Sequence, residues 1–494
     1  MDLLTETAQN VFGLTYLFPY QRLVITNILR KAGLFSPEEA EEAPPNQVVL
    51  LPTGAGKSLC FMLPAVLLPG LTIVIFPLLG LMADQLRRVE EAGMKGALLK
   101  GGMDRREKEK LWQSVQAGEV QMLLTNPEML TLPEVQEKLK DVKISHLVID
   151  EAHTIPEWGE TFRPACLELG KTFNNLPVEQ LTAFTATASP LILGKIQDYL
   201  LKDMPFNLVR ANPDRVNIYY EVRPVLSRMK GLENVLLAAE RPAIVFCPTR
   251  RQCERASLLL RERLAEPDSD EIRYYHAGLS PELRTIREKW FFDSPSGILC
   301  ATCAYGLGMD KSNIRTVIHL ALPASVEAYL QESGRAGRDR QPCRAVLLYH
   351  PEDRYREENN TRKELRERYE KLVAFAEDSK TCRRESLLTI LEAEPEDCDS
   401  CDVCKNQVLL KDPAEDVICK IVREYRKRFN TRMLRDFLLG RHSPEIRQGR
   451  YYRSPGFGIF RNWDPDDMKE VIGGMILSGK IRERPRGSWK GKLH

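Results

Sequence analysis

Short and almost wholly apolar runs recur along this chain, and between them apolar residues return every three or four positions. The first series of runs lies at residues 48–51, 71–76, 121–125, 147–149 and 181–184, and the second at 243–247, 274–278, 297–302 and 316–319. Consecutive apolar positions are typical of strands buried on both faces of a parallel sheet. Because helical stretches separate the runs, the pattern predicts an α/β fold with two parallel, doubly wound sheets in tandem.

The apolar pattern breaks between residues 207 and 220, where the sequence Asn212-Pro213-Asp214 favours a turn between domains. After the second series the chain becomes polar and rich in cysteine, and then helical patterns return. We therefore predict four domains, at residues 1–207, 208–345, 346–410 and 411–494.

A glycine-containing loop follows the first apolar run and precedes a helical stretch. It has the sequence Pro52-Thr53-Gly54-Ala55-Gly56-Lys57-Ser58. The backbone of such a loop can hold phosphates, Lys57 can reach the β and γ phosphates of ATP, and the Ser58 hydroxyl can bind Mg²⁺. The strict pattern has glycine where this chain has Leu51, so the loop is a variant. A plain surface turn is the alternative, and the order strand, loop, helix disfavours it.

Two carboxylates follow the run at residues 147–149, which places them at the edge where open α/β sheets bind ligands. Asp150 is suited to hold Mg²⁺ through water, and Glu151 is suited to polarise the water that attacks the nucleotide. A solvated acidic loop is the alternative interpretation. The phosphate loop upstream favours the catalytic one.

The second series has no phosphate loop but carries two arginines within residues 331–338. Arg335 and Arg338, spaced by three, lie on one face of a helix or turn. Such a pair can reach the γ-phosphate of a nucleotide held by another domain, so hydrolysis can depend on domain closure. A charged surface helix is the alternative, and the flanking glycines disfavour it.

Four cysteines lie close together in a polar stretch that is too short to build a core. Cys398, Cys401 and Cys404 are separated by two residues each, and fifteen residues separate Cys382 from Cys398. Four thiolates can close a tetrahedral Zn²⁺ site and supply folding free energy to such a segment. Disulfides, free thiols and an iron–sulfur cluster are the alternatives.

Composition is that of an ordinary globular chain, with 494 residues, 43% hydrophobic and 28% charged. The net charge is only +2, but residues 411–494 contain twenty Lys and Arg against eleven Asp and Glu, which indicates a nucleic-acid partner for this part. No apolar run approaches the roughly 20 residues that span a bilayer. We therefore expect no membrane association and a cytoplasmic protein, nucleoid-associated if bacterial. Four cysteines in apolar contexts are predicted core residues: Cys60, Cys166, Cys247 and Cys300.

Taken in order, these motifs resemble the helicase core of superfamily 2, and within it the RecQ family of ATP-dependent DNA helicases. The shared motifs are Gln21, the phosphate loop, residues 150–153, Thr185-Ala186-Thr187, Ala301-Thr302 with residues 306–310, and residues 331–338. The family-specific part follows His153 and contains Trp158, Phe162 and Arg163. It resembles the aromatic-rich loop that couples single-strand binding to hydrolysis, and exposed aromatic rings stack on bases without sequence preference.

The resemblance implies RecA-like helicase lobes at 1–207 and 208–345, a zinc-binding subdomain at 346–410 that uses all four cysteines, and a winged-helix domain at 411–494. It implies ATP bound between the lobes, with Gln21, Gly308 and Asp310 at the nucleotide. It assigns DNA binding or coupling to His153, Trp158, Phe162, Arg163 and Thr302. The implied activity is 3′→5′ unwinding in recombination, repair or replication. The implied partners are single-stranded DNA and single/double-strand junctions, and we expect a monomer.

In the terminal domain, Asp464 and Pro465 are typical of a helix start, and residues 480–484 suit a wing strand. Because the chain ends at His494, we expect no additional C-terminal nucleic-acid-binding domain.

Two positions depart from the family pattern. Leu14 stands where an adenine-stacking aromatic is usual and Phe18 where an arginine is usual, so Tyr16 or Tyr20 is expected to pack the adenine instead. Residues 36–46 have the composition of an acidic inserted loop. An RNA helicase, a duplex translocase that does not unwind and a scaffold with an inactive motor are the alternative functions. The Trp158 segment and the cysteines disfavour the first two, and intact motor residues disfavour the third.

Overall fold

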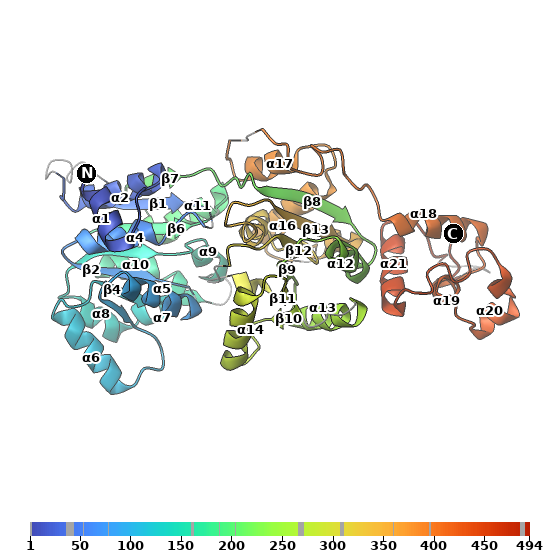
Figure 1. Ribbon diagram of the computed structural model, residues 1–494, viewed down its shortest axis with the longest axis horizontal. Coiled ribbons are helices and arrows are strands. Elements are labelled where there is room, and N and C mark those ends of the chain that lie inside the picture. Colours follow the sequence, from blue (N-terminus) through green and yellow to red (C-terminus); the bar gives the residue numbers. More distant parts are fainter. Residues whose placement is uncertain are drawn as a thin grey trace. The chain divides into compact units, whose positions relative to one another are not determined.

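The computed structural model describes all residues except 1, 36–43, 53, 78, 160–162, 187, 203, 265–270, 307–310, 359, 395–396 and 485–489. The chain forms two compact units, and the first comprises Met1–Asp214 with Leu388–Glu394 (Figure 1). The second comprises Arg215–Leu387 with Pro395–His494. Within the first unit, Arg210 donates to the carbonyl of Glu392 at 3.1 Å. This hydrogen bond connects the segment Leu388–Glu394 to β7 (Phe206–Arg210) of the first unit.

The first unit is built on a seven-stranded sheet in the order β3-β4-β2-β5-β6-β1-β7, with every neighbouring pair parallel. Its strands are β1 (Asn46–Leu50), β2 (Leu71–Ile75), β3 (Gly96–Leu98), β4 (Met122–Thr125), β5 (Ile144–Ile149), β6 (Leu181–Thr185) and β7 (Phe206–Arg210). Its helices are α1 (Leu3–Phe12), α2 (Pro19–Lys31), α4 (Leu59–Leu67), α5 (Leu79–Glu91), α6 (Arg105–Gln116), α7 (Pro127–Leu130), α8 (Pro133–Leu139), α9 (Thr154–Gly159), η1 (Pro164–Cys166), α10 (Leu169–Asn175), α11 (Pro190–Ile196) and η2 (Gln197–Leu201). The predicted parallel sheet is confirmed.

Successive residues of the central strands enter two separate cores. Ile73 and Leu147 pack into one core, while Val74 and Val148 pack into the other, and all four are at most 1% exposed. Since successive side chains of a strand point to opposite faces, a sheet buried on both sides requires apolar residues at every position. This burial explains the continuous apolar runs in the sequence.

The strand register gathers the predicted site at one edge of this sheet. Leu50 of β1 lies opposite Thr185 of β6, and Ile149 of β5 lies opposite Ala183 of β6. Strand β6 therefore separates the phosphate loop, which follows β1, from the acidic pair, which follows β5.

The second unit contains a six-stranded parallel sheet in the order β10-β11-β9-β12-β13-β8. Its strands are β8 (Ile218–Pro224), β9 (Ala243–Phe246), β10 (Ile272–Tyr275), β11 (Ile298–Ala301), β12 (Thr316–His319) and β13 (Cys343–Tyr349). The helices that accompany them are α12 (Arg228–Leu237), α13 (Arg250–Arg263), α14 (Pro281–Asp293), η4 (Cys303–Gly306) and α15 (Val326–Ser333). The predicted core cysteines Cys60, Cys166, Cys247 and Cys300 are all buried.

The rest of the second unit is mainly helical. Its elements are η5 (Pro351–Tyr355), α16 (Lys363–Glu377), α17 (Arg383–Ile390), α18 (Pro413–Glu424), α19 (Thr431–Leu438), α20 (Pro444–Gln448), η6 (Tyr451–Arg453) and α21 (Pro465–Leu477). Ile418, Leu434, Phe437 and Met468 bring α18, α19 and α21 together in one buried core. Asp464 caps α21 by accepting from the backbone of Asp466, as the sequence predicts for a helix start.

The described chain differs from the predicted elements in two respects. The expected wing strand at 480–484 is shorter than predicted, because only residues 482–484 pair antiparallel with residues 491–494, around the bridge between Glu483 and Leu493. Four strands were not predicted: β3, β7, β8 and β13. Strand β8 is an edge strand that carries Glu221 and Arg223, so its sequence lacks the continuous apolar run of a central strand.

His146 in β5 gives the first unit a pH-dependent stability. Its side chain is fully buried, Nε2 lies 2.8 Å from Thr182 Oγ1, and burial lowers the pKa of the imidazole to about 3. In the folded chain the ring stays neutral, whereas the unfolded chain takes up a proton below about pH 6.5. Its contribution to the unfolding free energy should therefore fall by about 1.4 kcal/mol per pH unit from about pH 6.5 towards pH 3.

We predict that His146→Gln makes the melting temperature of the first unit less sensitive to acid, because glutamine can bond Thr182 without taking up a proton. Differential scanning calorimetry at pH 7.5 and 5.5 measures the difference. His442→Gln, at an exposed imidazole in the second unit, is the matched control. Equal acid sensitivity of parent and His146→Gln would contradict this account.

Candidate nucleotide and nucleic-acid site

The phosphate loop lies between β1 and α4, in the context that the sequence predicts. Gly54 and Gly56 have φ angles of 84° and 74°, a left-handed conformation that favours glycine. A Cβ on Gly56 would lie 2.6 Å from Gln21 Nε2, so a side chain there would displace Gln21. Ser58 immediately precedes α4, and Thr53 lies outside the described residues.

Gln21 joins the N-terminal helix α2 to this loop. Its side chain is 4% exposed, Oε1 accepts from the backbone of Phe18 at 3.0 Å, and Nε2 donates to the carbonyl of Ala55 at 3.1 Å. The Tyr20 hydroxyl donates to the same carbonyl at 3.2 Å. The amide nitrogen of Gln21 thus binds the loop backbone, while its oxygen caps the start of α2.

Three aromatic rings lie together at the start of α2, next to Gln21. Phe18 and Tyr20 stack with ring centroids 5.5 Å apart, and Tyr16 meets Phe18 edge to face at 5.6 Å. Tyr16 is 63% exposed, so its ring is open to solvent. The assignment of adenine packing to Tyr16 or Tyr20 stays a prediction.

Lys57 connects the phosphate loop to both acids. Its Nζ lies 2.9 Å from Glu151 Oε1 and 3.8 Å from Asp150 Oδ1, with all three side chains 12–14% exposed. Burial raises the pKa of Asp150 to about 6, although the nearby Lys57 charge acts in the opposite direction. The three side chains lie together at the sheet edge, where a triphosphate and a hard cation would meet a lysine and two carboxylates.

His153 links the acidic pair to the end of β6. Its Nδ1 lies 3.0 Å from Thr185 Oγ1 and 3.4 Å from Glu151 Oε2, and the ring is buried. Thr185 begins the Thr-Ala-Thr motif, of which Thr187 lies outside the described residues. His153 thus connects Glu151 to the strand that lies between the phosphate loop and the acids.

The segment after His153 is partly helical. Trp158 lies in α9 and is partly exposed, so the loop predicted from its neighbouring Gly and Pro was wrong at this residue. Arg163 lies 5.6 Å from the Trp158 ring centroid and binds Glu128 through two bonds of 2.7 and 2.6 Å. Arg163 also donates to the carbonyl of Pro77. Phe162 lies outside the described residues.

Glu128 was not among the predicted site residues. The signal available in the sequence is its place directly after the β4 run, in Asn126-Pro127-Glu128, at the same sheet edge as the acids. Sequence spacing alone does not show that Arg163 reaches it from 35 residues away.

In the second unit, Arg335 and Arg338 lie in a turn after α15, and Arg335 is 4% exposed. Arg215 holds this turn by donating to the carbonyls of Gly334 at 3.1 Å and Gly337 at 2.8 Å. Asn217 donates to the Gly337 carbonyl at 2.8 Å as well. The turn geometry therefore depends on two residues that the motif itself does not contain.

Thr302 is buried directly after β11, in the same unit as the arginine turn. Burial raises the pKa of Tyr305, three residues further on, and the charge of Arg335 acts in the opposite direction. The predicted nucleotide residues Gly308 and Asp310 lie outside the described residues.

The four predicted cysteine ligands come together. Their four sulfur atoms all lie within 4.8 Å of one another, and the sulfurs of Cys382 and Cys401 are 3.9 Å apart. The four residues are Cys382, Cys398, Cys401 and Cys404. Tetrahedral zinc with Zn–S bonds of about 2.3 Å places sulfurs about 3.8 Å apart, whereas a disulfide joins them at about 2.05 Å. The donor set and its spacing therefore fit zinc.

A buried arginine, Arg383, supports the segment that carries these cysteines. Arg383 binds Asp402 through bonds of 2.8 and 3.2 Å, and Asp402 accepts from the backbone of Val222 in β8 at 3.1 Å. Tyr220 of β8 forms a bridge with Cys401. The cysteine segment is thus docked on the edge of the second sheet.

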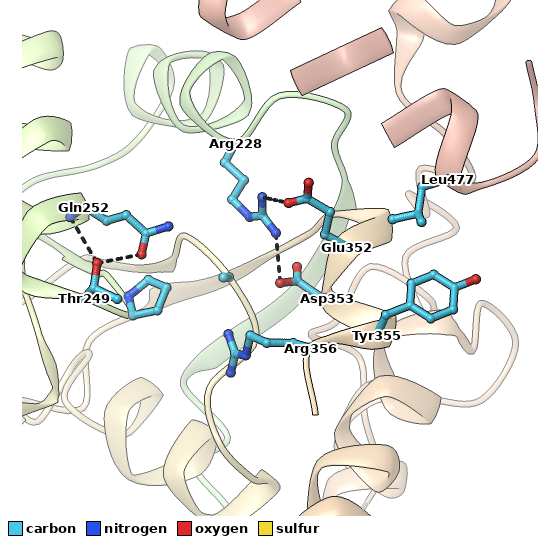
Figure 2. A pocket seen from close by; sticks show the side chains of 10 residues that line it. Arg228, Thr249, Gln252, Glu352, Asp353, Tyr355, Arg356 and Leu477 are labelled. Carbon is cyan, nitrogen blue, oxygen red and sulfur yellow. Dashed lines mark hydrogen bonds and ion pairs between the residues drawn. The ribbon is translucent and has the colours of Figure 1, made fainter. Parts of the chain in front are cut away.

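A separate cavity of about 420 Å³ lies in the second unit, beside residues that follow β9, β12 and β13 (Figure 2). Arg228 lines the cavity and forms ion pairs with Glu352 at 3.0 Å, Asp353 at 3.1 Å and Glu470 at 2.9 Å. His350, Glu352 and Glu470 also lie near enough to share a cation. The guanidinium already supplies the positive charge there, so we assign no metal to this group.

A phosphate loop and acid pair on one parallel sheet, joined in sequence to a second such sheet with an arginine turn, define the class of two-lobed nucleic-acid motors. Family models match in the same order: DEAD/DEAH box helicase at residues 18–192, helicase conserved C-terminal domain at 227–340, RecQ zinc-binding at 339–405 and RQC domain at 411–489.

This chain is 30% identical to the ATP-dependent DNA helicase RecQ of Haemophilus influenzae and 31% identical to that of Pasteurella multocida. These matches cover 88% and 89% of this chain and 71% and 70% of theirs. This chain belongs to the RecQ family of ATP-dependent DNA helicases. The family and the cysteine cluster support ATP and Zn²⁺ as its cofactors.

Solved helicase structures share the fold. Mycobacterium smegmatis helicase Lhr bound to ssDNA and AMP-PNP matches with a TM-score of 0.56 at 20% identity, over 100% of this chain and 60% of that one. Mss116p bound to ssRNA and AMP-PNP matches with a TM-score of 0.57 at 18% identity, over 92% and 93%. Among the described residues, no helix combines the length and apolar character needed to cross a membrane.

We predict that purified protein carries about one zinc per chain and that Cys401→Ser removes most of it, because a structural site needs all four ligands. Metal analysis by mass spectrometry measures the content. Cys419→Ser, at a cysteine of α18 outside the cluster, is the matched control and should keep the metal. Absence of bound metal from the parent protein would contradict the zinc assignment.

Proposed function

We propose that this chain is an ATP-driven motor that moves along single-stranded DNA with 3′→5′ polarity and separates duplex DNA. The observation that carries the proposal is the contact of Lys57 with both acids at the edge of the first sheet, on a chain of the RecQ family. Recombination, repair or replication is the proposed setting, in the cytoplasm and, in a bacterium, at the nucleoid. The proposed active form is a monomer.

In this proposal, Lys57 exchanges its carboxylate partners for the β and γ phosphates when ATP binds. Ser58 and Asp150 would hold Mg²⁺, which would neutralise phosphate charge. Glu151 orients and polarises the attacking water. Because Lys57 and Glu151 are already within 2.9 Å of each other, binding of the triphosphate would free the Glu151 carboxylate for that role.

Arg335 and Arg338 are proposed to stabilise charge on the γ-phosphate. A guanidinium is suited to this because its fork of N–H donors matches phosphate oxygens. The burial of Arg335 and the support of its turn by Arg215 favour a defined orientation over a solvated surface role.

DNA coupling is proposed to begin at Trp158 and Arg163. A base stacked on Trp158 would compete for the ring face beside Arg163, and Arg163 contacts Glu128 and Pro77 in the first unit. His153 would pass on the change through Glu151 and Thr185. In the second unit, Thr302 is assigned to the strand path.

The basic C-terminal segment is proposed to hold the duplex. Its Lys and Arg excess lies in residues 411–494, which match the RQC domain model over 411–489. Contacts of this kind go to phosphates and carry no sequence information. A single/double-strand junction is therefore the proposed substrate.

We predict that the full chain separates duplexes with a 3′ single-stranded tail in the presence of ATP and Mg²⁺, and that Lys57→Ala reduces DNA-stimulated hydrolysis and unwinding to background. Phosphate release and gel-based strand separation with both tail polarities are the measurements. RNA strands in place of DNA test the alternative RNA helicase. If RNA and DNA strands stimulated ATP hydrolysis equally, the RNA helicase would be favoured.

Lys57→Ala leaves two mostly buried carboxylates without their lysine, so its folding must be checked. Lys57→Arg keeps the charge, and its melting temperature should match the parent more closely. Hydrolysis by folded Lys57→Ala at the parent rate would remove Lys57 from its assigned role.

We predict that Trp158→Ala keeps basal hydrolysis but loses most of its stimulation by single-stranded DNA, since loss of a base-stacking ring costs about 1–3 kcal/mol per base. Hydrolysis rates with and without oligonucleotide measure the stimulation ratio, and Trp158→Phe should retain part of it. Phe292→Ala, at a 55% exposed ring of α14, is the control. An unchanged ratio in Trp158→Ala contradicts the coupling role.

A further inference from the structure

Gln85 reaches the phosphate loop from a helix that the nucleotide motifs do not include. It lies on α5, and its Nε2 donates to the Ser58 hydroxyl oxygen at 3.1 Å from a position 27 residues further along the chain. Helix α5 follows β2, and the phosphate loop follows β1. Because the strands of this sheet are parallel, the helix and the loop both begin at the same edge of the first sheet. A contact to the side chain of Ser58, rather than to the loop backbone, bears directly on what the hydroxyl can bind.

The other end of the Gln85 amide is free to accept. Its Oε1 is buried, and within the described part of the chain it has no hydrogen-bond partner. Buried polar atoms normally have partners, and one that lacks a partner at a functional site calls for a ligand or water. A purely structural tie between α5 and the loop would need only the Nε2 contact.

The chemistry of a serine hydroxyl makes the Nε2 contact directional. The oxygen has one proton to donate and two lone pairs. Because Gln85 occupies one lone pair, the other lone pair and the proton are directed away from α5. Ser58 is thereby prepared to bind a cation through one lone pair and to donate its proton to a neighbouring acceptor.

We propose that Gln85 is a positioning residue of the nucleotide site, which orients Ser58 for a hydrated divalent cation and accepts a hydrogen bond from a water of that cation through Oε1. The assignment rests on the proposed nucleotide function. It suits Mg²⁺ in particular, because this ion keeps several of its waters and needs groups that bind them. Gln85 does not touch the reacting phosphate, so its effect passes through Ser58 and the water shell.

Gln85→Met in the full chain tests the assignment, because methionine has a similar length but neither amide group. Fluorescent N-methylanthraniloyl-ADP, titrated in EDTA and then at increasing Mg²⁺, separates binding of the nucleotide from binding of the ion. We expect metal-free ADP affinity to stay within about twofold of the parent, while the Mg²⁺ concentration needed for half-maximal tightening rises about tenfold or more, as for other groups that orient metal ligands. Mn²⁺ binding followed by electron paramagnetic resonance should weaken in the same way.

A double-mutant cycle with Ser58→Ala shows whether Gln85 acts through the serine. In the Ser58→Ala background, Gln85→Met should raise the Mg²⁺ requirement less than in the parent, and the increase that remains measures the contribution of Oε1 to the water shell. Gln113→Met, at an exposed glutamine on α6, is the matched control and should change neither quantity.

The outcomes distinguish this assignment from the function on which it rests. An unchanged Mg²⁺ requirement in Gln85→Met, or an equal loss of metal-free ADP binding, overturns the positioning role and leaves the nucleotide site intact. Failure of the parent protein to bind ADP at all overturns the proposed function, and the assignment with it.

Discussion

The ion pairs of Lys57 with Glu151 and Asp150 are the interaction around which the first unit is arranged. They join the loop after β1 to the acids after β5, across the intervening strand β6. All three side chains are mostly buried, so their charges are weakly screened, and removal of one partner leaves the others uncompensated. His153 then ties Glu151 to Thr185 on the intervening strand. Three strand ends are thereby held in one geometry.

Contacts at the same edge connect this centre to the Trp158 segment. Arg163 binds Glu128 after β4 and the carbonyl of Pro77 after β2, and α5 begins two residues beyond Pro77. From α5, Gln85 returns to Ser58 in the phosphate loop. The residues proposed for the nucleotide and the residues proposed for DNA therefore lie at the ends of neighbouring strands, and a short series of contacts connects them within one unit.

In the second unit, charged and polar side chains hold the segments that carry the arginine turn and the cysteine cluster. Arg215 binds carbonyls of the arginine turn, His319 lies 2.9 Å from Glu332 at the end of α15, and Arg383 binds Asp402 beside the cysteine cluster. Gly337 in the turn has a φ of 53° and no room for a Cβ, which would lie 2.5 Å from Asn217 Nδ2. The positions of the predicted arginine and cysteine site residues thus depend on residues outside their motifs.

The sequence by itself predicted the two parallel sheets, and it singled out Lys57, Asp150, Glu151 and the four cysteines as candidate site residues, because each follows from local pattern and spacing. It did not predict β8 or β13, since their sequences lack a continuous apolar run or lie at an expected boundary. Only the tertiary structure decided that Glu128 meets Arg163, that Arg215 holds the arginine turn and that Gln85 reaches Ser58. These are contacts between residues far apart in the chain, and they are made by the order of strands in the sheet, which no short stretch of sequence encodes.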